Sequence, residues 1–115
     1  AVTGVQTCAL PICYINAKKE DIIIVKSPVG MPGRAIKNPF INHIMAGERC
    51  APKKCLGCIK TCNPAETPYC ITDALANAAR GNIGEALLFC GADAWKTEKI
   101  ETVKEVIDFL LNLRV

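Results

Sequence analysis

Ile22-Ile23-Ile24-Val25 is a short run of β-branched residues on which the interpretation of the remaining sequence depends. Charged residues at positions 18–21 precede the run, and Ser27-Pro28 closes it. Such a run between turn-forming residues is typical of a buried strand. The next stretch, Gly30-Met31-Pro32-Gly33-Arg34, predicts a turn, because glycine adopts backbone angles that other residues avoid. The sequence therefore predicts one strand without a second strand beside it.

A first helix is predicted immediately after this turn. Asn38-Pro39 opens it, with Asn38 as the N-cap and proline at the first helical position, and Gly47 ends it. Its predicted apolar face consists of Phe40, Ile41, Ile44 and Met45.

Two more helices are predicted nearer the C-terminus. One covers residues 73–81, with Thr72 or Asp73 as its cap and Gly81-Asn82 as its stop. The last covers about residues 97–113, and its apolar residues fall on one face at helical spacing. These are Ile100, Val103, Val106, Ile107, Leu110 and Leu111.

A single strand and a few helices do not close a domain by themselves. A lone strand has no partner for its backbone groups, and the apolar faces of the helices need another layer to pack against. The fold class that the sequence predicts is therefore a mostly helical piece, with one short strand and a cysteine-rich loop, taken from a larger α/β body.

The composition excludes several kinds of partner. The chain has 115 residues, 22% of them charged, which is typical of a globular protein. The net charge of +3 is spread along the chain, so no basic stripe indicates nucleic acid binding. No apolar run reaches the length of a membrane span. We therefore expect a cytoplasmic protein with neither a nucleic acid nor a membrane partner.

The first residues have an unusual composition. Residues 2–12 read Val-Thr-Gly-Val-Gln-Thr-Cys-Ala-Leu-Pro-Ile, which resembles the translation of a sequencing-library adapter. We expect residues 1–12 to be non-native and residues 13–115 to form the natural part of the chain. Leaving out Cys8 reduces the eight cysteines of the sequence to seven.

Most of these cysteines gather in a loop over residues 48–71. Cys50, Cys55, Cys58, Cys62 and Cys70 have the spacing C-x4-C-x2-C-x3-C-x7-C. Closely spaced thiols in one loop favour a shared metal, either zinc or an iron–sulfur cluster. A disulfide pair and a set of inert reduced thiols remain alternatives. A secreted disulfide protein is a weak interpretation, because the cysteines are clustered and no secretion signal is recognisable.

Other residues have weaker claims to chemistry. Residues 30–34 suit a phosphate-binding turn, but a structural turn is the better interpretation because the glycine spacing of nucleotide motifs is absent. His43 is the only histidine, and no triad can be built around it. Asp93 suits either ligand contact or helix capping, and Trp95 suits packing.

Three stretches, taken in order, resemble the C-terminal part of the nitronate monooxygenase family, formerly called 2-nitropropane dioxygenases. This family includes the flavin-type enoyl-acyl-carrier-protein reductases. The stretches are residues 27–38, residues 55–62 with 69–75, and residues 89–96. The resemblance implies a TIM-type barrel that holds FMN, with the present chain as its C-terminal portion. A whole barrel takes about 250 residues, so most strands would lie upstream of Tyr14.

The resemblance also implies where the chemistry takes place. The FMN phosphate loops and the histidine base would lie upstream, so we expect no catalytic residue in this chain. Gly91, Ala92 and Asp93 would lie nearest the mouth of the flavin site. The implied reaction is oxidation of an alkyl nitronate through FMN and oxygen, with NAD(P)H-dependent reduction of an enoyl thioester as the alternative. A small cysteine-rich metal-binding interaction module is the alternative from another class.

Overall fold

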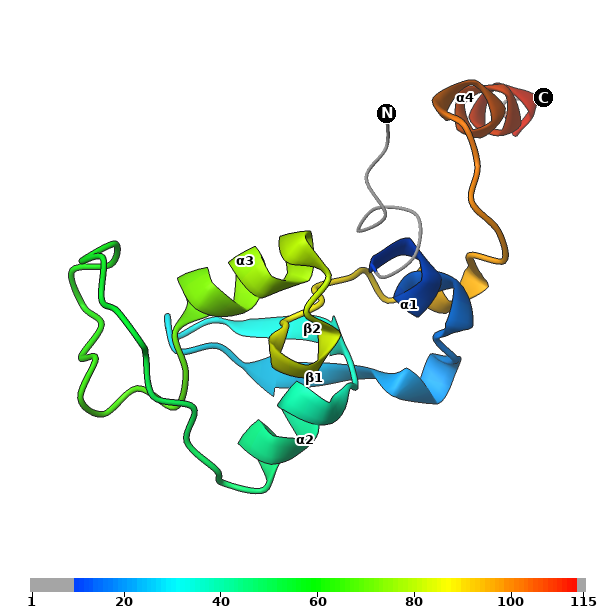
Figure 1. The fold of residues 1–115 in the computed structure, drawn as a ribbon. Helices are drawn as coiled ribbons and strands as arrows, with labels where there is room; N and C mark the ends of the chain where they lie inside the picture. The colour runs from blue at the N-terminus through cyan, green and yellow to red at the C-terminus, as the bar shows by residue number, and fades with distance from the viewer. Residues whose placement is uncertain (1–9, 114–115) are drawn as a thin grey trace.

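The computed structural model describes residues 10–113, which form four α-helices and two strands, as Figure 1 shows. In chain order the main elements are α1 (Leu10–Asn16), β1 (Ile22–Lys26), β2 (Pro32–Ile36), α2 (Pro39–Met45), α3 (Ile71–Arg80) and α4 (Val103–Asn112). Three short 3-10 turns lie between them: η2 (Lys19–Asp21), η3 (Ile83–Glu85) and η4 (Ala94–Lys96). Within this part of the chain no helix is long and apolar enough to cross a membrane.

The first strand is not alone, contrary to the prediction from the sequence. β1 and β2 pair in an antiparallel hairpin, with a register that runs from Ile22 opposite Ile36 to Lys26 opposite Pro32. The turn occupies only the start of the expected stretch: Gly30 has a φ of 91°, and its N–H donates to the Ser27 carbonyl at 3.1 Å. Gly33 and Arg34, expected in the turn, therefore lie inside β2.

The strands also have one exposed face. Val25 is buried, whereas the side chain of Ile24 is 65% exposed, so β1 is half-buried and not fully buried as the run of β-branched residues predicted. Neighbouring residues of a strand point to opposite faces, which explains the difference between the two side chains.

A third segment, residues 86–90, runs along the other side of β2. The N–H of Ile36 donates to the Leu88 carbonyl at 2.9 Å, and that of Cys90 donates to the Arg34 carbonyl at 3.0 Å. Phe89 forms an isolated antiparallel bridge with Ala35. The hairpin is thus extended by a segment that lies about fifty residues further along the chain.

Two apolar clusters hold the helices against these strands. The first joins β1, β2, α2 and the start of α3, and it includes Val25, Ala35, Phe40, Ile41, Tyr69, Ala74 and Leu87. The second joins α1, the end of β2 and the second half of α3, and it includes Ala17, Ile36, Ala78, Ala86 and Leu88. Ala35 and Ile36 divide between the clusters, as do Leu87 and Leu88, because successive residues face opposite sides.

Helix α2 begins as the sequence predicts. The Asn38 side-chain oxygen accepts a hydrogen bond from the Ile41 N–H at 3.0 Å, and Pro39 occupies the first helical position. The side-chain amide of Asn38 also donates to the carbonyls of Ile83 and Ala86, at 3.1 and 2.7 Å. One prediction for this helix is wrong: Met45 is 63% exposed, because the helix ends before its last turn reaches the core.

Helix α3 begins earlier than predicted. Its N-cap is Cys70, without a side-chain capping hydrogen bond, and Thr72 and Asp73 lie in the first turn instead of capping it. Gly81 ends the helix with a φ of 84°, a left-handed conformation that glycine adopts without strain. The predicted C-terminal boundary is therefore confirmed.

Helix α4 is shorter than the predicted span of residues 97–113. Thr102 caps it, with a hydroxyl that accepts from the Glu105 N–H while the Glu105 carboxylate accepts from the Thr102 N–H. This capping box fixes the start of the helix. Figure 1 shows α4 at the end of an extended linker, away from the sheet and the other helices. Its large apolar side chains are exposed, from 42% at Val106 to 76% at Val103.

We predict that Asn38→Asp destabilises the fold. The new carboxylate still accepts from the Ile41 N–H, but it cannot donate to the carbonyls of Ile83 and Ala86. A buried polar network that loses its donors costs about 1–3 kcal/mol. Urea unfolding should show this loss, whereas Asn42→Asp on the exposed side of the same helix should change little. Equal stability of the two variants would contradict the role assigned to Asn38.

We also predict that removal of residues 101–115 leaves the stability of the remaining body nearly unchanged, within about 0.5 kcal/mol. The described residues of this segment are all exposed, so their removal takes away no packing. Leu88→Ala is the matched positive control, because Leu88 is 1% exposed and such truncations cost about 2–5 kcal/mol. A large loss on removal of the segment would mean that α4 packs against the body.

Candidate functional site

The cysteine-rich loop between α2 and α3 is closed at its base. The Cys50 N–H donates to the Pro68 carbonyl at 2.8 Å. The Arg49 guanidinium donates to the carbonyls of Thr67 and Pro64, at 3.0 and 2.7 Å. Arg49 therefore ties the two arms of the loop together, and residues 51–66 extend beyond this closure.

Tyr69 anchors the loop to the body. Its side chain is 1% exposed, and its ring meets Phe40 of α2 edge-on with centroids 5.3 Å apart. Its hydroxyl donates to the Lys26 carbonyl of β1 at 3.3 Å, and burial raises the pKa of this phenol. The backbone carbonyl of Tyr69 accepts from the Thr67 hydroxyl at 2.9 Å. The loop is thus held in place by its C-terminal arm.

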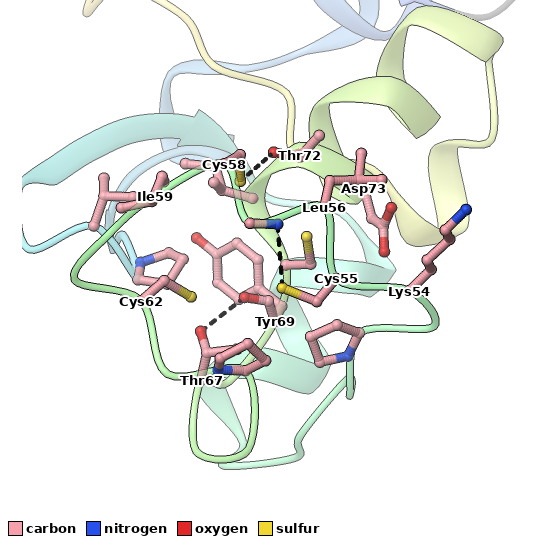
Figure 2. Close-up of a pocket in the computed structure, with 17 residues that line it drawn as sticks. Lys54, Cys55, Leu56, Cys58, Ile59, Cys62, Thr67, Tyr69, Thr72 and Asp73 are labelled. Atoms are coloured by element: carbon pink, nitrogen blue, oxygen red, sulfur yellow. Dashed lines mark hydrogen bonds between the residues drawn. The ribbon is translucent and has the colours of Figure 1, made fainter.

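A cavity of about 260 Å³ lies between this loop and the start of α3, as Figure 2 shows. Ile59, Tyr69 and Ile71 contribute apolar walls, and Lys54 and Asp73 contribute one charge of each sign. Four cysteines also line the cavity: Cys55, Cys58, Cys62 and Cys70. The close-up shows sulfur atoms on several sides of the Tyr69 ring, so the thiols are distributed around the space.

Local hydrogen bonds position the thiols at the tip of the loop. The Gly57 N–H donates to Cys55 Sγ at 3.4 Å, and Gly57 has a φ of 64°, which permits the tight turn between Cys55 and Cys58. Cys58 Sγ lies 3.2 Å from the Thr72 hydroxyl of α3. The tip is therefore connected to the first turn of α3 through this side-chain contact.

Cys50 is separated from the other four predicted ligands. It lies at the closed base of the loop and lines a second cavity, of about 500 Å³, which also touches Phe40, His43 and Asn77. Cys70 lines both cavities. The structure therefore groups four of the five predicted cysteines and leaves Cys50 on the other side of Cys70.

The thiols do not converge on one point. Among residues 10–113, no three His, Cys, Asp or Glu side chains lie close enough together to hold a single metal ion. Each cysteine from Cys13 to Cys90 is a free thiol, so this part of the chain contains no disulfide. The predicted zinc or iron–sulfur ligation stays a prediction.

His43 lies at the rim of the second cavity. Its Nδ1 is 2.6 Å from a carboxylate oxygen of Glu48, and the two side chains are 57% and 61% exposed. The exposed pair gives the only histidine of the sequence a position at the surface. Nothing around it resembles a catalytic triad among the described residues.

The stretch expected near the flavin directly follows the third segment and lies outside both cavities. Gly91, Ala92 and Asp93 are exposed, and none of them lines either cavity. Asp93 pairs with Lys96 at 3.2 Å and makes no side-chain capping bond to η4. Their proximity to a flavin stays a prediction.

Trp95 follows this stretch in η4. The ammonium groups of Lys19 and Lys96 lie 5.9 and 5.6 Å from its ring centroid, which is within the range of a cation–π contact. Trp95 is half-buried and belongs to neither apolar cluster, so its packing role stays a prediction.

A second set of thiols escaped the sequence analysis. Cys13 and Cys90 pack against the second apolar cluster beside Tyr14, whose hydroxyl donates to the Phe89 carbonyl at 2.6 Å. Burial raises the pKa of Cys13, and it raises the pKa of Cys90 despite the opposing charge of Arg34. In the sequence, the apolar residues next to Cys13 and Cys90 could have indicated that these two thiols are partly buried.

The first comparison with known proteins concerns sequence. No protein-family model and no curated protein sequence matches the chain. These sequence comparisons therefore show no family for the chain. What the fold itself shows is a partial α/β arrangement, so the next comparison rests on structure.

Among solved structures, the chain is similar to FabK from Thermotoga maritima, with a TM-score of 0.66 and 19% sequence identity. The match covers 97% of this chain and 31% of the FabK chain. The chain thus spans about a third of that protein's length, and at this identity the likeness shows a shared fold.

We predict two rates of thiol modification. Cys55 and Cys58 are exposed and should react with iodoacetamide first, whereas Cys13 and Cys90 should react last. Burial blocks access to the latter pair and raises their pKa, so fewer thiolates exist at neutral pH and more form as the pH rises. Peptide mass spectrometry at pH 7 and pH 9 measures both effects. Equal rates for the two groups at pH 7 would contradict the burial.

Proposed function

We propose that this chain is the C-terminal part of an FMN-dependent oxidoreductase of the nitronate monooxygenase type. The observation that carries the proposal is the likeness to FabK across nearly the whole chain. FabK is a flavin-dependent enoyl-acyl-carrier-protein reductase with a TIM-type barrel. This is the group of enzymes that the three sequence stretches resemble, so two separate lines of argument lead to the same class.

The three stretches also form one continuous piece of the fold. The first contains β2 and the third contains Phe89 and Cys90, and these pair directly through Ala35 and Arg34. The second meets the first in the first apolar cluster, which contains Tyr69 and Ala74 together with Ala35. Residues that carry the resemblance are therefore in mutual contact, as parts of one inherited structure should be.

The exposed face of α4 supports a larger body. Val106, Ile107 and Leu110 are each at least 42% exposed, and they lie on one side of a capped helix. Contiguous exposed apolar side chains usually mark a surface that another part of a protein covers. We propose that the missing barrel supplies this cover.

We expect the described residues to border a flavin site and not to form its centre. Within residues 10–113, every buried side-chain nitrogen or oxygen has a hydrogen-bond partner, so no orphaned polar group is set aside for FMN phosphate. Gly91 is open on its side-chain face, with no atom within 4 Å of an added Cβ. FMN would supply the electron transfer, while residues 91–93 would border the cofactor and help to exclude water.

The choice between the two branches of chemistry depends on the donor of electrons. In the monooxygenase branch, an alkyl nitronate reduces FMN and oxygen reoxidises it. In the reductase branch, NAD(P)H reduces FMN and an enoyl thioester accepts the electrons. The likeness to FabK favours the reductase as the second candidate function.

A cysteine-rich metal-binding interaction module is a third candidate, from another class. The thiol-lined cavity favours it, because closely spaced thiols are ligands for zinc or an iron–sulfur cluster.

We predict that the protein encoded by the reading frame extended upstream of Tyr14 contains FMN. Purified without oxygen, it should show flavin absorption bands and should release about one FMN per chain on acid precipitation. The 115-residue chain alone should bind no FMN, because the phosphate loops are proposed to lie outside it. A colourless extended protein would overturn the flavin proposal, and tight FMN binding by the chain alone would overturn the placement of the phosphate site.

The same preparation separates the two branches. Bleaching of the flavin by ethyl nitronate without nicotinamide indicates the monooxygenase. Bleaching by NADH or NADPH, followed by reoxidation with an enoyl thioester, indicates the reductase. A flavin that responds to neither donor would contradict both substrate assignments.

A further inference from the structure

We propose that Cys55, Cys58, Cys62 and Cys70 together hold an iron–sulfur cluster in the cavity of the loop, and that Cys50 takes no part. All four proposed ligands line the same cavity, whereas Cys50 faces the other one. The inference rests on this loop alone and does not depend on the flavin proposal.

The four thiols come from different parts of the loop and so reach the cavity from different sides. Cys55 and Cys58 belong to the tip of the loop, Cys62 to its returning arm, and Cys70 to the N-cap of α3. In Figure 2 the labelled cysteines approach the cavity from different directions. Four thiolates from one short segment are the ligand set that both common cluster types use.

The arrangement of the thiols does not suit a single metal ion. Four thiolates on one zinc stand about 3.8 Å apart, since each zinc–sulfur bond is about 2.3 Å. In the part of the chain from residue 10 to residue 113, no three candidate ligands approach closely enough to share an ion. A cluster places several iron and sulfide atoms between its ligands, so the thiolates surround a space.

The cavity provides such a space. Its volume of about 260 Å³ is far larger than a single water molecule requires, which is about 15 Å³ on this measure. Ile59, Ile71 and the buried ring of Tyr69 form much of the wall. An apolar wall limits the access of water, which protects a cluster and tunes its reduction potential.

Local donors suit the negative charge of a thiolate-bound cluster. The Gly57 N–H already points at Cys55 Sγ, and the Thr72 hydroxyl lies beside Cys58 Sγ. Hydrogen bonds to ligand sulfurs are among the features that set cluster potentials. Cys70 is the N-cap of the ten-residue helix α3, and the N-terminus of a helix is favourable for a negatively charged ligand. Lys54 adds a positive charge at the rim, partly opposed by Asp73.

Anaerobic reconstitution of the 115-residue chain with ferrous iron and sulfide tests the inference. We expect a brown protein, with broad visible absorption that bleaches on reduction with dithionite. Iron and acid-labile sulfide should be bound in equal amounts, about two to four of each per chain. Because this chain is expected to bind no flavin, the result is independent of the flavin experiment.

Single serine substitutions identify the ligands. Cys55→Ser, Cys58→Ser, Cys62→Ser and Cys70→Ser should each lose most of the iron and the visible absorption. Cys50→Ser and Cys90→Ser are matched controls and should retain both. Cys55 and Cys58 are exposed, so their replacement leaves the core intact, and circular dichroism verifies that these variants keep the fold of the parent.

Three outcomes would overturn the inference. The first is a chain that takes up no iron and sulfide while circular dichroism shows it folded. The second is loss of the cluster in Cys50→Ser with retention in Cys55→Ser, which would mean a different ligand set. The third is incubation with zinc alone giving one tightly bound zinc per chain on the same four cysteines, with no cluster formed on reconstitution.

Discussion

The side-chain amide of Asn38 uses its donors and its oxygen on three backbone groups at the centre of the fold. It caps α2 through the Ile41 N–H, and it holds the carbonyls of Ile83 and Ala86, which lie more than forty residues further along the chain. Residues 86–90 depend on this anchor for their alignment with β2. Because the amide is buried, water cannot replace any of these hydrogen bonds. This one side chain therefore ties the start of α2 to η3 and to the start of the third segment.

The parts of the fold that the sequence predicts correctly are those fixed by local chemistry. Asn38 followed by Pro39 specifies a helix start, and Gly81 specifies a helix end. Each acts within one turn on the backbone N–H or C=O groups that a helix terminus leaves without an intrahelical partner. β2 escapes prediction for the opposite reason. Its sequence contains Pro32 and Gly33, which are poor strand formers, and its pairing with Phe89 arises from residues distant in the chain. Gly33 is nevertheless suited to its position, because an added Cβ would collide with the Phe89 ring.

In the candidate site, too, the sequence predicts the local features but not the contacts between distant segments. The sequence places five cysteines in one loop, and the loop lies where it is expected. It does not distinguish Cys50 from the others, because that distinction comes from the closure of the loop by Arg49 and from the Cys50–Pro68 hydrogen bond. Likewise, the sequence names Thr72 as a cap, whereas the structure places its hydroxyl against Cys58. The roles of these residues follow from contacts between segments, which spacing alone does not contain.

The described sheet leaves β1 at an edge, since β2 pairs with β1 on one side and with residues 86–90 on the other. An unpaired edge offers a row of backbone groups to any other extended chain. The isolated chain also exposes the apolar face of α4, so it has two surfaces through which copies of the chain can associate. Self-association at high concentration is the expected consequence, and β1 is the place where intermolecular strand pairing would begin. Dilute, cool expression should therefore improve the yield of monomer more than any substitution in the core.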